Sequence, residues 1–178
     1  NTWAALKIKK QIEINWDEGE AAGLDSEKIR NDMLDASKEK GGIVRKEGNV
    51  KMALKSSVNQ IEATYESPLQ AHATMEPMNC TAYVQRDKCQ VWVGTQDPNG
   101  ARKIASKITG LSKEQVEVNV TFLGGGFGRR AFNDFVKEAV EISNDMKKPV
   151  KLTWSREEDM QHDYYRPPSL HVMKGAFD

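Results

Sequence analysis

The chain has 178 residues, and its 26 Lys and Arg residues balance 26 Asp and Glu residues, so its formal net charge at pH 7 is zero. This balance argues against nucleic acid as the main partner, because proteins that bind nucleic acid usually present a basic face. No apolar run approaches the length needed to span a membrane. The first residue is not Met, and we expect the chain to be an excised piece of a longer protein.

The first third of the chain predicts a small α/β piece. A helix cap at Asp25 or Ser26 starts a helix that continues to about residue 37, with Ile29 and Met33 facing inward. Gly41-Gly42 ends that helical region. The other expected elements are a helix at 3–10, strands at 12–16, 43–46 and 58–65, and a helical turn at 50–54.

The character of the sequence changes near Ser67-Pro68, where a hairpin with strands at 81–84 and 90–93 follows. Cys80 and Cys89 fall on opposite arms of this hairpin, and the spacing of strand residues puts them roughly 13–17 Å apart. A disulfide requires much closer Cα atoms, so we expect two free thiols.

After the hairpin the pattern alternates between helices and strands. The expected elements are a helix from about Asn99 to Gly110, a strand at 116–122, a helix at 132–142 and a strand at 150–154. Such βαβαβ order usually joins parallel neighbouring strands by right-handed crossovers. Because the strands alternate in polarity, we expect an α+β fold in which helices cover mainly one face of a mixed sheet.

A glycine-rich loop lies between the second of these strands and the helix that follows it. Residues 123–132 read Leu-Gly-Gly-Gly-Phe-Gly-Arg-Arg-Ala-Phe. The glycines allow close approach of another group, and the N-terminus of the next helix and two arginines favour an anion or an electron-rich oxygen. The loop matches neither the P-loop nor the dinucleotide fingerprint. A loop that is glycine-rich only because the turn is tight remains an alternative.

The predicted topology brings three turns to one edge of the sheet. Ligands of open sheets of this kind gather beyond the carboxyl ends of the strands. Thr95-Gln96, the glycine-rich loop and the acidic run 157–159 each follow one strand, so Gln96 is a candidate donor to an oxygen of a ligand. The acidic run could supply general bases, but a solvated surface is the favoured interpretation.

The histidines give a weaker signal. His72 and Glu76 have the four-residue spacing of metal ligands on a helix, but Pro77 would end such a helix. We therefore expect a hydrogen-bonded structural histidine at position 72, and the same for the isolated His162 and His171. The aromatic segment 164–168 could line a pocket or pack against the chain.

Four segments occur in an order that resembles the large subunit of the xanthine oxidase family of molybdenum hydroxylases. The Arg-Arg pair at 129–130 and residues 162–167 most resemble the isoquinoline 1-oxidoreductase beta-subunit branch. By this resemblance, residues 67–178 are the first part of the molybdopterin-binding domain, and residues 1–66 are the end of the preceding α/β hammerhead-like region with a linking strand. The segments are Ala71–Pro77, Val93–Gln96, Gly124–Gly128 and Pro149–Met160.

The resemblance implies a set of cofactor-binding residues. Gln96 would hydrogen-bond an oxygen ligand of the molybdenum, and Phe127 and Gly128 would flank the metal without coordinating it. Arg129 and Arg130 would lie near the pterin phosphates or at the base of the loop. The full implied set is Gln96, Gly125, Gly126, Phe127, Gly128, Arg129 and Arg130.

The resemblance also implies an activity, hydroxylation with water as the source of oxygen. The cofactor would be molybdopterin, in its cytosine dinucleotide form, and electrons would leave through a [2Fe-2S] small subunit. Xanthine-oxidising members have an acidic residue where this chain has Ala131, so the expected substrates are N-heteroaromatics or aldehydes rather than purines.

The catalytic glutamate of the family lies far downstream in the large subunit, so we expect no catalytic residue in this chain. The chain would then need the rest of the large subunit, and alone would be inactive and without cofactor. The sequence leaves the bacterial cytoplasm and periplasm open. Two alternatives remain, a stand-alone anion- or nucleotide-binding module that uses Gly124–Arg130, and a structural or assembly domain.

Overall fold

The computed structural model describes residues 1–177, which form two compact units. The first unit contains Asn1–Lys10 and Ala71–Tyr165, and the second contains Gln11–Gln70 and the chain from Arg166 onward. No single boundary near residue 66 divides the two units, because the second unit combines two segments that are far apart in the sequence. The assignment of residues 1–66 and 67–178 to two family domains stays a prediction.

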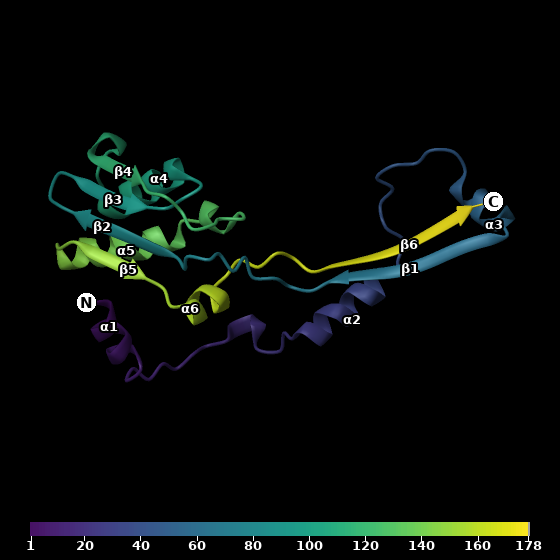
Figure 1. The fold of residues 1–178 in the computed structure, drawn as a ribbon, viewed down its shortest axis with the longest axis horizontal. Helices are drawn as coiled ribbons and strands as arrows, with labels where there is room; N and C mark the ends of the chain where they lie inside the picture. The colour runs from purple at the N-terminus through teal and green to yellow at the C-terminus, as the bar shows by residue number, and fades with distance from the viewer. Residues whose placement is uncertain (178) are drawn as a thin grey trace. The chain divides into compact units, whose positions relative to one another are not determined.

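The first unit is built on a mixed four-stranded sheet with the order β4-β3-β2-β5 (Figure 1). β2 pairs antiparallel with both β3 and β5, whereas β3 and β4 are parallel. Short 3-10 turns at Lys113–Gln115 and Arg129–Ala131 complete the unit. Its elements are α1 (Thr2–Lys9), β2 (Asn79–Val84), β3 (Cys89–Val93), α4 (Pro98–Thr109), β4 (Val116–Val120), α5 (Asp134–Met146), β5 (Val150–Thr153) and α6 (Arg156–Gln161).

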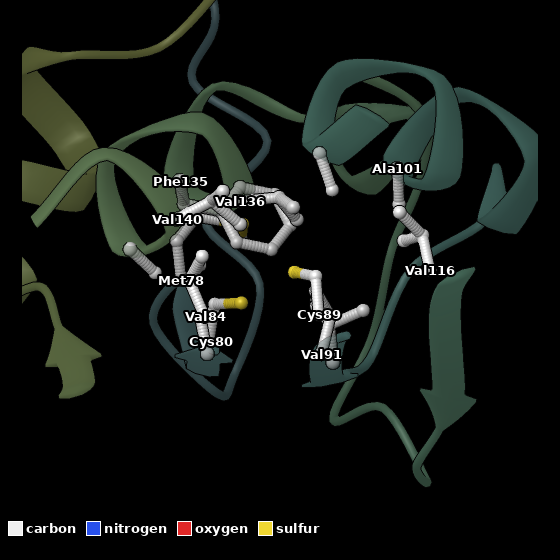
Figure 2. Packing of buried hydrophobic residues seen from close by; sticks show 14 of the residues in the cluster. Met78, Cys80, Val84, Cys89, Val91, Ala101, Val116, Phe135, Val136 and Val140 are labelled. Carbon is white, nitrogen blue, oxygen red and sulfur yellow. The ribbon is translucent and has the colours of Figure 1, made fainter. Parts of the chain in front are cut away.

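The core lies between this sheet and the helices α4 and α5. Every second residue of β2 and β3 is buried, as expected where one face of a sheet packs on helices. Figure 2 shows strand residues facing the apolar side chains of the helices. The expected α+β fold with helices mainly on one sheet face is confirmed. The core residues drawn there include Cys80, Val84, Cys89, Val91, Ala101, Phe135, Val136 and Val140.

The helix ends follow ordinary capping chemistry. The Asp97 carboxylate accepts the N–H of Gly100 at the start of α4, and Gly110, with φ of 74°, ends that helix. Ser112 and Gln115 form the expected capping box in the following 3-10 turn. These caps confirm the bounds expected for the helix and fix where β4 begins.

The second unit is an open arrangement around a two-stranded sheet. Its β1 (Asn59–Ser67) and β6 (Ser169–Phe177) pair antiparallel along their whole length (Figure 1). It also contains α2 (Ser26–Ala36), capped by Asp25 as expected, and α3 (Val50–Ser56). None of its described residues is fully buried. A two-stranded sheet without a buried core is at best marginally stable by itself.

Two of the predicted strands are wrong. Residues 12–16 and 43–46 form no regular structure, and Ile12, Ile14 and Ile43 are exposed. Residues 12–16 have the alternating apolar residues of a strand and residues 43–46 begin with two β-branched residues, but neither segment pairs with another strand among residues 1–177. A strand requires hydrogen bonds to a neighbour, and periodicity alone does not provide one. Over the same residues, no helix is both long enough and apolar enough to cross a bilayer.

The two cysteines are free and buried, as expected, and oppose Val93 and Val84 rather than each other. Burial raises the pKa of the Cys80 thiol to about 12 and that of Cys89 to about 11. We therefore predict that neither thiol reacts with a maleimide at pH 8 until the protein is unfolded, as measured by mass mapping of the labelled peptides. Asp87→Cys, in the exposed turn of the hairpin, is the control that should react at once. Rapid labelling of Cys80 in the folded protein would contradict this packing.

Candidate functional site

The carboxyl ends of β3, β4 and β5 lie at the same edge of the sheet. β4 is parallel to β3, and β5 has the same direction because both β3 and β5 are antiparallel to β2. The expectation that three turns meet at one edge is therefore confirmed. The expectation that all three strands are neighbours is wrong, since β2 and β3 lie between β5 and β4. The connection from β4 through α5 to β5 therefore passes over β3 and β2.

Gln96 lies against the glycine-rich loop. Its backbone N–H donates to the carbonyl of Arg130 at 3.0 Å, and the N–H of Gly128 donates to Gln96 Oε1 at 3.1 Å. The Gln96 side chain is exposed, and its amide nitrogen has no partner among residues 1–177. Gln96 therefore holds the loop through its oxygen and keeps an NH₂ donor available at the same edge.

The loop has a backbone conformation that strongly favours glycine. Gly125 and Gly128 have φ values of 97° and 102°, and Phe127 has φ of 53°. A Cβ on Gly126 would lie 2.5 Å from Gln96 Oε1, which real Cβ atoms essentially never do. The side chain of Phe127 is 70% exposed. The loop is thus a strained turn that presents an aromatic ring to solvent and leaves Gly125 and Gly128 partly exposed, whereas Gly126 is buried.

The loop itself supplies hydrogen-bond donors to this site. Within residues 1–177, the N–H groups of Gly125, Gly126 and Phe127 have no acceptor. Helix α5 begins at Asp134, after a 3-10 turn, so the predicted helix start at Phe132 is wrong. No side chain caps the N-terminus of α5, so the amides of the loop are a source of donors in addition to the helix N-terminus.

Arg130 fills the base of the loop. Its guanidinium is fully buried and donates to the carbonyls of Gly125, Gly94 and Glu76 at 2.8, 3.1 and 2.8 Å. It also pairs with the Glu76 carboxylate at 2.9 Å. Burial lowers the pKa of Arg130, and the negative charge of Glu76 opposes that shift. Arg130 therefore ties together three segments that meet at the sheet edge.

Arg129 is equally buried and binds a different set of partners. Its guanidinium makes two hydrogen bonds to Asp134, at 2.9 and 2.8 Å, and lies 3.2 Å from Asp163. The Nε atom is not aligned for a hydrogen bond to Asp163 and remains unpaired. The rings of Trp154 and Tyr164 lie 5.3 Å from the guanidinium carbon, so Tyr164 packs against the chain.

The two arginines thus occupy the base of the loop, one of the two positions that the family resemblance implies for them. Their charges are matched by three carboxylates, Glu76, Asp134 and Asp163. Neither guanidinium reaches the exposed surface of the loop. The expectation that the arginines make this surface attractive to anions is therefore wrong, because carboxylates inside the protein neutralise their charges.

Glu76 makes several contacts with the loop that the sequence pattern did not predict. Its Oε2 accepts the N–H of Gly124 at 2.9 Å, and its own N–H donates to the carbonyl of Gly124 at 3.1 Å. Burial raises the pKa of this carboxyl, but hydrogen bonds from Gly124 and Asn79 and the charge of Arg130 outweigh burial, so the pKa lies below its ordinary value. Only the order of the family motifs could have indicated this contact.

The histidine and acidic residues have structural partners. His72 Nδ1 lies 2.9 Å from Asp163 Oδ1, so the expected hydrogen-bonded histidine is confirmed. In α6, Glu157 is exposed, as expected of a solvated acidic run, but Asp159 is buried and pairs with Arg156 at 2.7 Å. The expectation of a solvated surface is therefore wrong for Asp159. No group of three possible metal ligands occurs among residues 1–177.

We predict that Glu76→Gln lowers the free energy of unfolding at pH 7 by about 1–2 kcal/mol, because buried Arg130 loses its charged partner. A carboxyl whose pKa is lowered on folding stabilises the protein above its ordinary pKa of 4.5. That contribution is lost as the pH falls through the lower folded value. The difference between wild type and variant, measured by urea unfolding, should therefore shrink below pH 4.5. Glu39→Gln, on an exposed residue, is the control, and a difference that grows with acid would contradict the assigned role.

Comparison with known proteins identifies the family. The model of the molybdopterin cofactor-binding domain matches residues 36–178. The chain is 28% identical over 178 residues to a membrane-bound aldehyde dehydrogenase [pyrroloquinoline-quinone] of Gluconacetobacter polyoxogenes, covering 98% of this chain and 23% of that protein. It is 33% identical over 102 residues to isoquinoline 1-oxidoreductase subunit beta of Brevundimonas diminuta, covering 57% of this chain and 13% of the relative.

Among solved structures, quinoline 2-oxidoreductase from Pseudomonas putida 86 has the same fold over 80% of this chain and 19% of its own, with a TM-score of 0.62 and 20% identity. The chain thus spans less than a quarter of the length of these relatives. The resemblance seen in the sequence motifs is confirmed by the domain match. The chain belongs to the molybdopterin cofactor-binding domain family of xanthine oxidase-type molybdenum enzymes.

Proposed function

We propose that this chain supplies one wall of the molybdopterin site in a molybdenum hydroxylase that acts on aldehydes or N-heteroaromatic compounds. The observation that carries the proposal is the meeting of Gln96 with the glycine-rich loop at one sheet edge. An NH₂ donor and three free backbone N–H groups lie there together. The names of the relatives, an aldehyde dehydrogenase and an isoquinoline oxidoreductase, support the class of substrate.

The loop has room for a group that approaches its backbone. A Cβ added to Gly128 would contact only His72, at 3.7 Å, so the space beside this residue is open. A Cβ on Gly126 would instead collide with Gln96, because the Gln96 side chain occupies the space beside Gly126. A flat, oxygen-bearing cofactor fits this combination of open backbone and outward donors. The residues present therefore fit the group that the family binds.

The roles of the residues follow from their positions. When bound, the molybdenum cofactor would supply the oxidative hydroxylation of an electron-poor carbon with oxygen from water. Gln96 would donate its NH₂ to an oxygen of the cofactor, and the amides of Gly125, Gly126 and Phe127 would bind further oxygen atoms. The exposed Phe127 ring would exclude water from the metal, with Gly128 in contact with the cofactor.

Arg129 and Arg130 would act through the loop. Their hydrogen bonds fix its conformation before the cofactor arrives, which lowers the entropic cost of binding. We place neither guanidinium in direct contact with the cofactor, because both are fully buried against carboxylates and carbonyls.

The rest of the enzyme is also part of the proposal. Ala131 provides no acidic group next to the loop, which favours N-heteroaromatics or aldehydes over purines. The cofactor would be the cytosine dinucleotide form of molybdopterin, and a [2Fe-2S] small subunit would accept the electrons. The catalytic base would come from the remainder of the large subunit, so residues 1–178 alone would be inactive and free of cofactor.

A nucleotide- or anion-binding module is the second candidate, and the free N–H groups of the loop favour it. The arginine charges do not, because they are neutralised at the base of the loop. Stabilisation of the isolated chain by inorganic phosphate, in the absence of molybdenum, would support this second candidate.

Gln96→Glu tests the proposal with a minimal change. Glutamate retains an oxygen that accepts the Gly128 N–H, but replaces the outward NH₂ with a negatively charged oxygen. In the natural protein that contains these residues, we predict that this variant folds normally and loses about tenfold or more in cofactor-dependent turnover, because one hydrogen bond becomes a repulsion.

The control is Gln85→Glu, the same chemical change in the exposed turn of the hairpin. It should leave both turnover and molybdenum content at the wild-type level. Wild-type turnover in Gln96→Glu, with normal molybdenum content, would contradict the placement of Gln96 at the cofactor.

A further inference from the structure

We propose that His72 is an additional cofactor-contact residue, which hydrogen-bonds through Nε2 to the molybdopterin where it lies against Gly128. This inference rests on the proposed function above. His72 is not part of the site implied by the sequence motifs, which give it a structural role only. The structure gives it two distinct ring nitrogens in two different environments.

One nitrogen is fixed inside the protein. His72 Nδ1 lies 2.9 and 3.0 Å from the two carboxylate oxygens of Asp163, and the backbone N–H of His72 also donates to that carboxylate. The side chain of Asp163 is 1% exposed, and Arg129 and the N–H of Tyr164 also bind it. The orientation of the imidazole is therefore determined by a buried, fully engaged carboxylate.

The other nitrogen is directed at the open side of the loop. His72 Nε2 lies 3.7 Å from the position that a Cβ on Gly128 would occupy, and apart from the chain neighbours of Gly128 no other atom of residues 1–177 lies within 4 Å of that position. Nε2 has no hydrogen-bond partner among residues 1–177, although the side chain as a whole is only 10% exposed. It is not among the fully buried atoms that lack a partner, so it reaches the surface of the site, where a ligand can bind it.

The carboxylate also fixes the chemistry of the free nitrogen. Asp163 can only accept a hydrogen bond, so Nδ1 carries the proton. In the neutral ring Nε2 is then an acceptor, suited to an N–H or O–H group of a ligand. A pterin edge carries such N–H groups, and a cofactor seated against Gly128 would bring one within reach of His72.

Two substitutions separate this role from a structural one. Asn in place of His72 puts a side-chain nitrogen near the Nδ1 position, so it retains the contact with Asp163 but has no atom at the Nε2 position. Gln reaches the Nε2 position with an amide but gives up the Nδ1 contact. A cofactor contact through Nε2 should be lost in Asn and retained in Gln, whereas a structural role predicts the reverse order.

The experiment uses the natural protein that contains these residues, with His72→Asn, His72→Gln and wild type purified in parallel. Molybdenum is measured by elemental analysis, the pterin by fluorescence after oxidative release, and folding by thermal unfolding. We expect cofactor retention during dialysis to fall about tenfold in His72→Asn, the ratio expected for one lost hydrogen bond, and to recover in His72→Gln.

Retention in His72→Asn at the wild-type level, or a greater loss in His72→Gln than in His72→Asn, would overturn the inference. If either variant unfolds at a markedly lower temperature, retention is measured for all three proteins at a temperature where each remains folded, and the order of the two variants still decides between the two roles. Absence of molybdopterin from the wild-type protein would refute the proposed function itself, which distinguishes the two failures.

Discussion

The ion pair between the partly exposed carboxylate of Glu76 and the buried guanidinium of Arg130 is the interaction on which the rest of the site depends. It joins the segment before β2 to the glycine-rich loop after β4, and Arg130 also binds the carbonyl of Gly94, the first residue after β3. A buried charge with one partner removed is costly, so the pair holds only as a complete network. Here the network is complete, because every hydrogen bond from Arg130 ends on a carbonyl or carboxylate of an adjacent segment. The loop can therefore adopt positive φ angles and leave its own amides free.

In this arrangement, the residues that shape the loop differ from those that face a ligand, although both sets are adjacent in the sequence. The charged residues of the segment 124–131 face inward and set the shape of the loop, while Phe127 and the amide of Gln96 face outward. A surface of neutral donors suits an oxygen-rich cofactor that is held by many weak contacts. A surface with two exposed arginines would instead attract phosphates without discrimination. The structure is thus better suited to a specific cofactor than to anions in general.

Much of the fold and part of the site could be predicted from the sequence. The helices around Ala101 and Ala139, the hairpin of Cys80 and the common edge of Gln96 and the loop all follow from local periodicity and sheet topology. Contacts between distant segments could not be predicted in this way. The placement of β5 beside β2, the role of Glu76 and the burial of Asp159 depend on long-range packing that no local pattern encodes. The strand expected at Ile12 failed for the same reason, since its partner does not exist among residues 1–177.

The most direct measurement is an experimental structure of the natural, cofactor-loaded protein. The proposed function requires the amide nitrogen of Gln96 within hydrogen-bond distance of an oxygen of the molybdenum cofactor, with Gly128 in van der Waals contact with it. The Arg130 guanidinium should lie on the Glu76 carboxylate and on the carbonyls of Gly125, Gly94 and Glu76. A cofactor bound away from the edge formed by Gln96 and the glycine-rich loop would contradict the account.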